Sequence, residues 1–200
     1  MKHFLTAFLL LMVCFSGVAQ SKSTNILFVG NSLTYTNDLP DMVEKEAKRR
    51  GIKVKTTMLA FPNYALVDHL DDGEVQKRIR SGKYDYVIVQ QGPSSQEEGR
   101  EMLFDAGKTL QKLCEQNQSR LVFFMVWPSR TYYHTFDGVI KNHKEAAEEN
   151  GAILCPVGEI WKANFDKTGD FSLYGLDGFH PSPKGSRLAA EVIVKTLFNE

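Results

Sequence analysis

The stretch NILFVGNSLTY, residues 25–35, joins a short apolar segment to an abrupt polar turn. Residues 26–29 are all apolar, which is typical of a buried strand. Gly30 and Asn31 follow at once, so the chain leaves the strand and delivers Ser32 at its carboxyl end. A serine is common where a helix begins, but a serine in this position can also be presented for chemistry. The residues that the rest of the chain brings to the same place decide between these interpretations.

Apolar, strand-like segments alternate with helical patterns along the whole chain. The segments expected to be strands are residues 26–29, 52–60, 84–89, 121–126 and 152–155. The segments expected to be helical are residues 39–50, 64–79 in pieces, 95–116, 139–150 and 186–198. Because most of the strands are continuous apolar runs, we expect an α/β fold with a five-stranded parallel sheet covered by helices on both faces.

Residues 1–19 have the layout of a secretory signal peptide. A basic start at Lys2 precedes the apolar residues 4–13, and the small residue Ala19 stands before Gln20, where we expect cleavage. The apolar segment is too short to span a membrane, which takes roughly 20 apolar residues. We therefore expect an exported protein without a membrane span.

The remaining residues, 20–200, are expected to form one domain that is periplasmic or extracellular. Cys14 offers an alternative, in which it is the lipid-bearing first residue of a lipoprotein. Val13 precedes it where a small residue would be expected, so anchoring is the less favoured of the two. The sequence does not indicate an oligomeric state.

The charge balance and the cysteines narrow the class of protein. Lysine plus arginine and aspartate plus glutamate number 24 each, so no basic excess points to nucleic acid as a partner. The histidines are scattered and no ligand spacing is evident, so we expect no metal and no cofactor. Cys114 and Cys155 either form one disulfide, as exported proteins allow, or are buried thiols.

A parallel sheet places its functional site at the carboxyl ends of the strands. Ser32 needs an adjacent base to act as a nucleophile, and the sequence GLDGFHPS, residues 175–182, offers His180 with Asp177 three residues before it. This spacing lets Asp177 bond one ring nitrogen while the other faces a nucleophile. The alternative is a simple helix cap by Asp177 or Ser182.

The other histidines fit different positions. His143 lies in a helix rich in lysine and glutamate, which indicates a surface residue. His69, in the helical piece LVDHL, is expected to be structural. His134 follows Tyr132 and Tyr133 on a loop that begins where a strand ends, so we expect it to line a pocket.

The motifs VGNSLT, residues 29–34, and DGFHPS, residues 177–182, resemble the first and last blocks of the SGNH (GDSL-like) hydrolase superfamily. The order of elements is similar to its flavodoxin-like, three-layer α/β/α fold. The resemblance implies Ser32 as nucleophile, His180 as general base and acid, and Asp177 as its orienting carboxylate. The elbow G-x-S-x-G of other hydrolases is absent, because Thr34 takes the place of the second glycine.

The middle blocks depart from the superfamily pattern. The resemblance implies an oxyanion hole formed by the backbone of Ser32, a second-block glycine and a third-block asparagine. Pro62 and Asn63 stand where the glycine is expected, and only Asn63 has an amide hydrogen to donate. Ser94 takes the place of the asparagine, but its hydroxyl is shorter, so a neighbouring glutamine is favoured as the donor, with Gln91 ahead of Gln90.

These features predict an exported serine esterase that hydrolyses small acyl esters, acetyl above all, on carbohydrate. Aromatic residues on the strand-end loops could stack on sugar rings. The residues expected to line the substrate site are Asn31, Tyr64, Gln90, Trp127, His134 and Phe179.

Three alternatives stay open at this point. The first is a non-catalytic module of the same fold that binds glycan. The second is a lysophospholipase or thioesterase, which would need a long apolar groove. The third is a flavodoxin-like cofactor binder, for which GNSLTYTND, residues 30–38, is only a partial phosphate-binding loop.

Overall fold

The computed structural model describes residues 23–198 and shows a five-stranded parallel sheet with the strand order β2-β1-β3-β4-β5. This is the flavodoxin-like order, and it confirms the predicted fold class. The predicted signal peptide, residues 1–19, lies outside the described residues. The strands are β1 (Thr24–Gly30), β2 (Val54–Ala60), β3 (Tyr86–Val89), β4 (Arg120–Phe124) and β5 (Ile153–Cys155).

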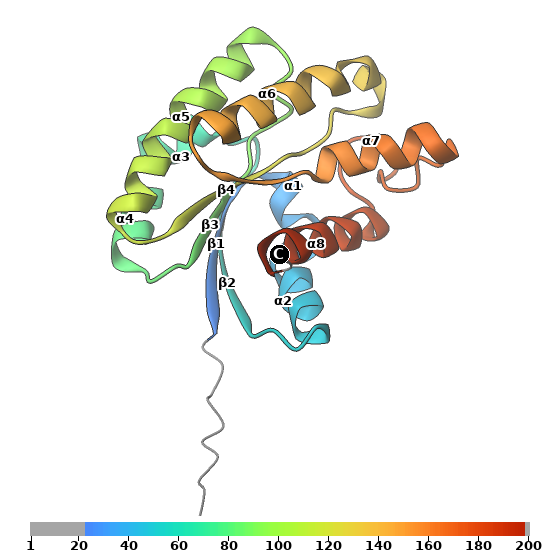
Figure 1. The fold of residues 1–200 in the computed structure, drawn as a ribbon. Coiled ribbons are helices and arrows are strands. Elements are labelled where there is room, and N and C mark those ends of the chain that lie inside the picture. Colours follow the sequence, from blue (N-terminus) through green and yellow to red (C-terminus); the bar gives the residue numbers. More distant parts are fainter. Residues whose placement is uncertain (1–22, 199–200) are drawn as a thin grey trace, which may run out of the picture.

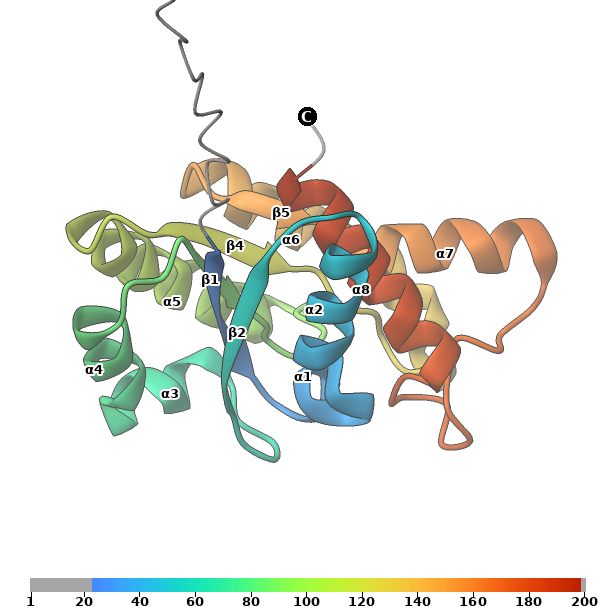
Figure 2. The ribbon, with the colours of Figure 1, turned by 90° about the horizontal axis from the view of Figure 1, so that it is seen from below.

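Helices cover both faces of the sheet (Figures 1 and 2). On one face α2, α7 and α8 pack over one apolar cluster, and on the other α3, α4 and α5 pack over a second. Helix α6 lies between α5 and α7. The helices are α1 (Ser32–Tyr35), α2 (Leu39–Arg49), α3 (Leu66–Asp72), α4 (Glu74–Ser81), α5 (Glu97–Gln116), α6 (Phe136–Glu149), α7 (Val157–Thr168) and α8 (Pro183–Phe198), with short 3₁₀ helices at η1 (Thr36–Asp38) and η2 (Arg130–Thr135).

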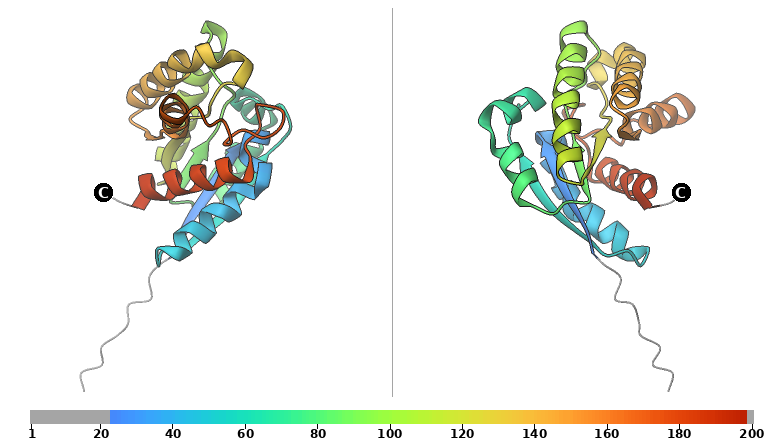
Figure 3. Two further views of the ribbon diagram at one scale, coloured as in Figure 1. Left: turned by 90° about the vertical axis from the view of Figure 1, so that its right-hand side faces the viewer. Right: turned by 60° about the vertical axis from the view of Figure 1, so that its left-hand side comes forward.

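The register of the sheet aligns the points where its strands end. Gly30 of β1 pairs with Ala60 of β2, and Val29 pairs with Val89 of β3. The loops that follow these three strands therefore start at one level, as a parallel sheet requires. Helix α2, near the start of the chain, and helix α8, at its end, cover the same face of the sheet, where α8 packs along α2 (Figure 3).

One helix was not expected from the sequence. No helix is expected between residues 155 and 186, but α7 occupies residues that follow Pro156. Its buried residues Val157, Trp161 and Phe165 recur every four positions, which is the helical period. The segment expected to be helical in pieces, residues 64–79, does form two helices, α3 and α4.

The two cysteines are free buried thiols rather than a disulfide. Cys114 belongs to the apolar cluster on one face of the sheet and Cys155 to the cluster on the other, so the sheet separates them. Burial raises the pKa of each thiol to about 12. Both side chains therefore act as small apolar groups in the core.

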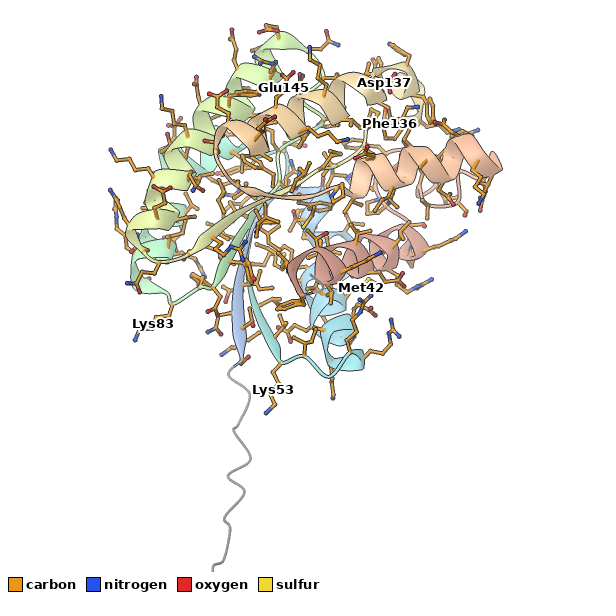
Figure 4. All side chains as sticks on the ribbon, viewed as in Figure 1. Met42, Lys53, Lys83, Phe136, Asp137 and Glu145 are labelled. Carbon is orange, nitrogen blue, oxygen red and sulfur yellow. The ribbon has the colours of Figure 1, made fainter. Side chains whose placement is uncertain are left out.

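The ends of the molecule differ in character. Figure 4 shows Lys53 and Lys83 at the end of the sheet where the strands begin, opposite the end that carries α1. Between residues 23 and 198, the helices are all too short or too polar to cross a bilayer. Because the site of a parallel sheet lies at the carboxyl ends of its strands, we look for it near α1.

His143 was expected on the surface, and this prediction was wrong. The charged residues around it face solvent, but His143 itself points inward and is 1% exposed. Its Nδ1 bonds the carbonyl of Val139, one turn earlier, at 2.9 Å. Because burial disfavours the charged ring, the pKa of His143 falls to about 4.

Burial of His143 predicts a loss of stability in mild acid. The unfolded chain binds this proton near pH 6.5 and the folded chain only near pH 4, so the contribution is complete above pH 6.5 and is lost as the pH falls toward 4. The loss is about 3 kcal/mol at most. Urea unfolding at pH 7 and at pH 4.5 should show a smaller difference for His143→Leu than for wild type; parallel losses in the two proteins would contradict it.

Candidate active site

Ser32 and His180 meet at the carboxyl end of β1, although 148 residues separate them. Ser32 is the first residue of α1, directly after the strand. The Nε2 atom of His180 lies 2.9 Å from the Ser32 hydroxyl oxygen, and its Nδ1 lies 2.6 Å from Oδ2 of Asp177. A hydroxyl, an imidazole and a carboxylate thus form one hydrogen-bonded chain, the arrangement by which a base activates a serine.

The loop that carries Asp177 and His180 is held by its own hydrogen bonds. Oδ1 of Asp177 accepts from the backbone N–H groups of Phe179 and His180, both at 2.9 Å. Gly178 has a φ of 67°, a conformation that favours glycine. Hydrogen bonds from the His180 ring, and then from these amides, lower the pKa of Asp177. The carboxylate is therefore ionised and fixes the orientation of the imidazole.

Trp127 was expected to line the substrate site, and the structure contradicts this. Its ring is completely buried and stacks on Trp161 with the ring centroids 3.5 Å apart. The indole Nε1–H donates to the carbonyl of Phe179 at 2.9 Å. Trp127 therefore anchors the histidine loop, the loop that carries Asp177 and His180. Its apolar ring belongs to the core, and its single N–H donor bonds the backbone of that loop.

Two cavities lie near this centre, and each is lined by a residue adjacent in the chain to the Ser32–His180 pair, Phe179 in one and Asn31 in the other. The larger, about 600 Å³, lies beside Phe179 and is also lined by Tyr132 and His134. The smaller, about 260 Å³, is lined by Asn31 and Tyr64 among others. Four of the six residues expected to line the site thus border a cavity next to the Ser32–His180 pair.

Three of the four predicted oxyanion donors, Asn63, Gln91 and Ser94, line the smaller cavity, and the fourth, Ser32, follows its lining residue Asn31 in the chain. The hydroxyl of Ser94 donates to the carbonyl of Gly92 at 3.0 Å, so it is already engaged. The amide of Gln91 accepts from Leu66 N–H through Oε1, and one of its two N–H groups is directed at a backbone carbonyl 3.4 Å away. The second N–H remains for a ligand. Asn63 has a φ of 61° on the exposed loop after β2.

Gln90 was expected to line the substrate site, and this too was wrong. It is fully buried beneath the turn that carries Ser32. Its Oε1 accepts two hydrogen bonds of 2.9 Å, from the backbone N–H of Asn31 and from the hydroxyl of Thr34. Gln90 thus supports the turn instead of facing substrate.

His69 also contacts this turn, which the sequence did not reveal. It is buried, and its Nε2 lies 2.8 Å from the carbonyl oxygen of Gly30. Burial lowers the pKa of His69, so the neutral ring donates this hydrogen bond. Its place on the apolar face of α3 marked it only as structural; nothing in the LVDHL motif indicates which group it would meet.

Solved structures with the same fold are found among ester hydrolases. A proposed SGNH hydrolase from Slackia heliotrinireducens is 26% identical, with a TM-score of 0.75 over 88% of this chain and 100% of that one. An acetyl xylan esterase is 12% identical, with a TM-score of 0.72 over 87% of this chain and 100% of that one. A lipase/acylhydrolase from Enterococcus faecalis is 15% identical, with a TM-score of 0.69 over 86% of this chain and 94% of that one. No protein-family model and no curated protein matches the chain.

A methyl group on Gly30 should disrupt the turn. A Cβ there would lie 2.4 Å from the Thr34 hydroxyl oxygen and 2.5 Å from Oε1 of Gln90, both of them buried. We expect Gly30→Ala to lower the free energy of unfolding by about 1–3 kcal/mol, measured in urea. Gly92→Ala is the matched control, because a Cβ there meets nothing within 4 Å. Equal stability of the two variants would refute the steric argument.

Proposed function

Since the chain belongs to the SGNH hydrolase superfamily, we propose that it is a serine esterase that removes small acyl groups, acetyl above all, from carbohydrate. The observation that carries the proposal is the unbroken chain of hydrogen bonds from Ser32 through His180 to Asp177. A module that only binds glycan has no use for this chain. The acetyl xylan esterase with the same fold agrees with the substrate class.

The mechanism is acyl transfer in two steps. Ser32 Oγ attacks the ester carbonyl carbon while Nε2 of His180 takes its proton. The carbon–oxygen bond to the alcohol then breaks, and His180 returns the proton to the departing alcohol. A water, deprotonated by the same nitrogen, attacks the acyl-enzyme and releases the carboxylic acid and Ser32. Asp177 stabilises the imidazolium that forms in each step.

The negative charge on the carbonyl oxygen needs donors on the side of the smaller cavity. We place there the backbone N–H of Ser32, the backbone N–H of Asn63 and the free N–H of Gln91. The hydroxyl of Ser94 is left out because it bonds Gly92. Each such donor contributes about 100- to 1000-fold in rate. In this assignment Gln91 supplies the side-chain N–H that an asparagine supplies in the superfamily pattern.

The carbohydrate belongs in the larger cavity. Its volume of about 600 Å³ suits one or two sugar rings, and it opens beside the histidine loop through Phe179. Tyr132 is 61% exposed at its rim, so its ring face is free to stack on a sugar. His134, on the same wall, offers a polar atom to a hydroxyl. Export through the predicted signal peptide would bring the enzyme to glycans outside the cytoplasm.

Loss of any member of the triad should abolish turnover. On a panel of acetyl, butyryl and octanoyl esters that includes acetylated xylooligosaccharides, we expect the wild type to prefer acetyl. Ser32→Ala and His180→Ala should each lower kcat by at least about 10⁴-fold, and Asp177→Asn by about 10³–10⁴-fold.

Ser119→Ala serves as the control, because the Ser119 hydroxyl donates to the carbonyl of Tyr84 near the start of β4, at the end of the sheet opposite the triad. It should keep full activity. Preference for octanoyl esters would favour the lipase or thioesterase alternative. A folded wild type that cleaves none of the esters would contradict the proposal and make glycan binding the next assay.

The position of Tyr132 predicts a selective effect on sugar substrates. Tyr132→Ala should raise KM for an acetylated xylooligosaccharide by about tenfold, equivalent to one lost stacking contact. It should leave hydrolysis of a small aryl acetate within about twofold, because the triad is untouched. Equal effects on both substrates would place the sugar elsewhere.

A further inference from the structure

The peptide group between Gly30 and Asn31, immediately before Ser32, is hydrogen-bonded by a side chain at each end. The carbonyl oxygen of Gly30 lies 2.8 Å from Nε2 of His69. The N–H of Asn31 donates to Oε1 of Gln90 at 2.9 Å. His69 belongs to α3, after β2, and Gln90 directly follows β3. The segments that follow β2 and β3, the two neighbours of β1 in the sheet, thus each place one buried side chain against the same peptide.

We propose that Gln90 and His69 form a clamp on this peptide that positions Ser32 for reaction; the inference rests on the esterase function proposed above. Neither residue touches the reacting atoms, so both are positioning residues. The chemistry they supply is one fixed acceptor and one fixed donor, which together set the plane of the peptide. The next peptide carries the N–H of Ser32 and is joined to the clamped one at Cα of Asn31, so the clamp also restricts the position of that oxyanion donor.

Gln90 is fitted to this role by its burial and its shape. Its side chain is fully buried, and Oε1 accepts both from Asn31 and from the Thr34 hydroxyl in the first turn of α1. Two buried donors thus depend on a single oxygen. The Nε2 of Gln90 has no hydrogen-bond partner among residues 23–198. The amide is therefore retained for its oxygen rather than for its nitrogen.

Gly30 makes the clamp possible. A Cβ at this position would lie 2.5 Å from Oε1 of Gln90, so only glycine lets the side chain pass beneath the peptide. The Gly-Asn-Ser order thus has a physical reason: the glycine admits Gln90, and Asn31 presents its N–H to it. The Asn31 side chain also accepts from the N–H of Leu33 at 3.1 Å, which caps α1.

His69 is held in place by aromatic packing. Its ring lies 5.0 Å from the ring of Tyr64 and 5.9 Å from that of Phe61, measured between centroids. The Gly30 oxygen also accepts the N–H of Phe61 at 3.2 Å. The loop after β2 therefore grips the carbonyl end of the peptide, while Gln90 grips the amide end.

The benefit of a fixed peptide lies in the short Ser32–His180 contact. The hydroxyl oxygen must stay near 2.9 Å from Nε2 of His180, and a displacement of about 1 Å at such a centre costs about 100-fold in rate. Ser32 lies only one residue beyond the clamped peptide. Rotation of that peptide would move the serine away from the imidazole without changing the substrate cavities.

The test uses the rate at which a fluorophosphonate phosphonylates Ser32; this reaction forms a phosphorus–oxygen bond to Oγ and expels fluoride, while His180 takes the hydroxyl proton. This rate reports the nucleophile and does not depend on the natural substrate. Gln90→Leu removes the oxygen that accepts from the Asn31 N–H and the Thr34 hydroxyl, and His69→Phe removes the hydrogen bond to the Gly30 carbonyl. Both keep the approximate side-chain volume, and phenylalanine also keeps the aromatic packing. We expect each to lower the rate by 10- to 100-fold, and kcat on an acetyl ester in parallel, with KM within about threefold.

Conservative variants separate positioning from mere stability. Gln90→Glu keeps the acceptor oxygen and replaces only the unpartnered nitrogen, and His69→Gln keeps a side-chain donor. Each should recover most of the lost rate. Ser119→Ala, which removes a partly buried hydrogen bond near the start of β4, should be phosphonylated at the wild-type rate. If Gln90→Leu does not fold, the pair His69→Phe and His69→Gln decides the question.

The outcomes are distinct. A wild type that is not labelled at all would defeat the esterase proposal itself. A labelled wild type with folded Gln90→Leu or His69→Phe variants of equal rate would overturn the clamp alone. Loss of rate that the conservative variants do not recover would also overturn it, since a bond to the peptide would then not be the cause.

Discussion

The hydrogen bond between Ser32 and His180 depends on the packing that brings the start and the end of the described chain together on one face of the sheet. Ser32 follows the first strand and His180 precedes the last helix, 148 residues later. The strand order places β1 inside the sheet, and α8 returns to pack along α2, which follows β1 after the short helices α1 and η1. The two ends of the described chain are thus joined by apolar packing on one face. The polar contact is a consequence of that packing, because hydrogen bonds of this kind contribute only about 1 kcal/mol each.

The centre divides its side chains into two groups. Ser32 and His180 are partly exposed and Asp177 is exposed, so solvent reaches all three. Directly below them, Gln90 and Trp127 are completely buried, and each gives one polar atom to the backbone of a site loop. A buried hydrogen bond is costly to break, so these residues restrict the loops more firmly than surface contacts would.

The sequence was informative where its signals were local. The Asp-x-x-His spacing alone predicts the bond between Asp177 and His180, and continuous apolar strands alone predict the parallel sheet. It was misleading at Trp127, Gln90 and His143, which looked like loop or surface residues from their neighbours. Their burial is decided by contacts far along the chain: Trp127 meets Trp161 only through α7, a helix that the sequence analysis did not anticipate.

The separation between the exposed side chains of the centre and the buried side chains that support its backbone also bears on the second and third sequence blocks, which depart from the superfamily pattern. A glycine and an asparagine give a superfamily member its oxyanion donors, whereas here Pro62 and Ser94 occupy those neighbourhoods. The Gly30–Asn31 peptide, which precedes the proposed donor N–H of Ser32, is nevertheless held from two sides, by Gln90 and by His69. Backbone donors require a fixed peptide plane and no particular side chain. A chain that secures this plane is free to vary the residues around it, and such variation at the middle blocks is consistent with a fold that solved structures match and family models do not.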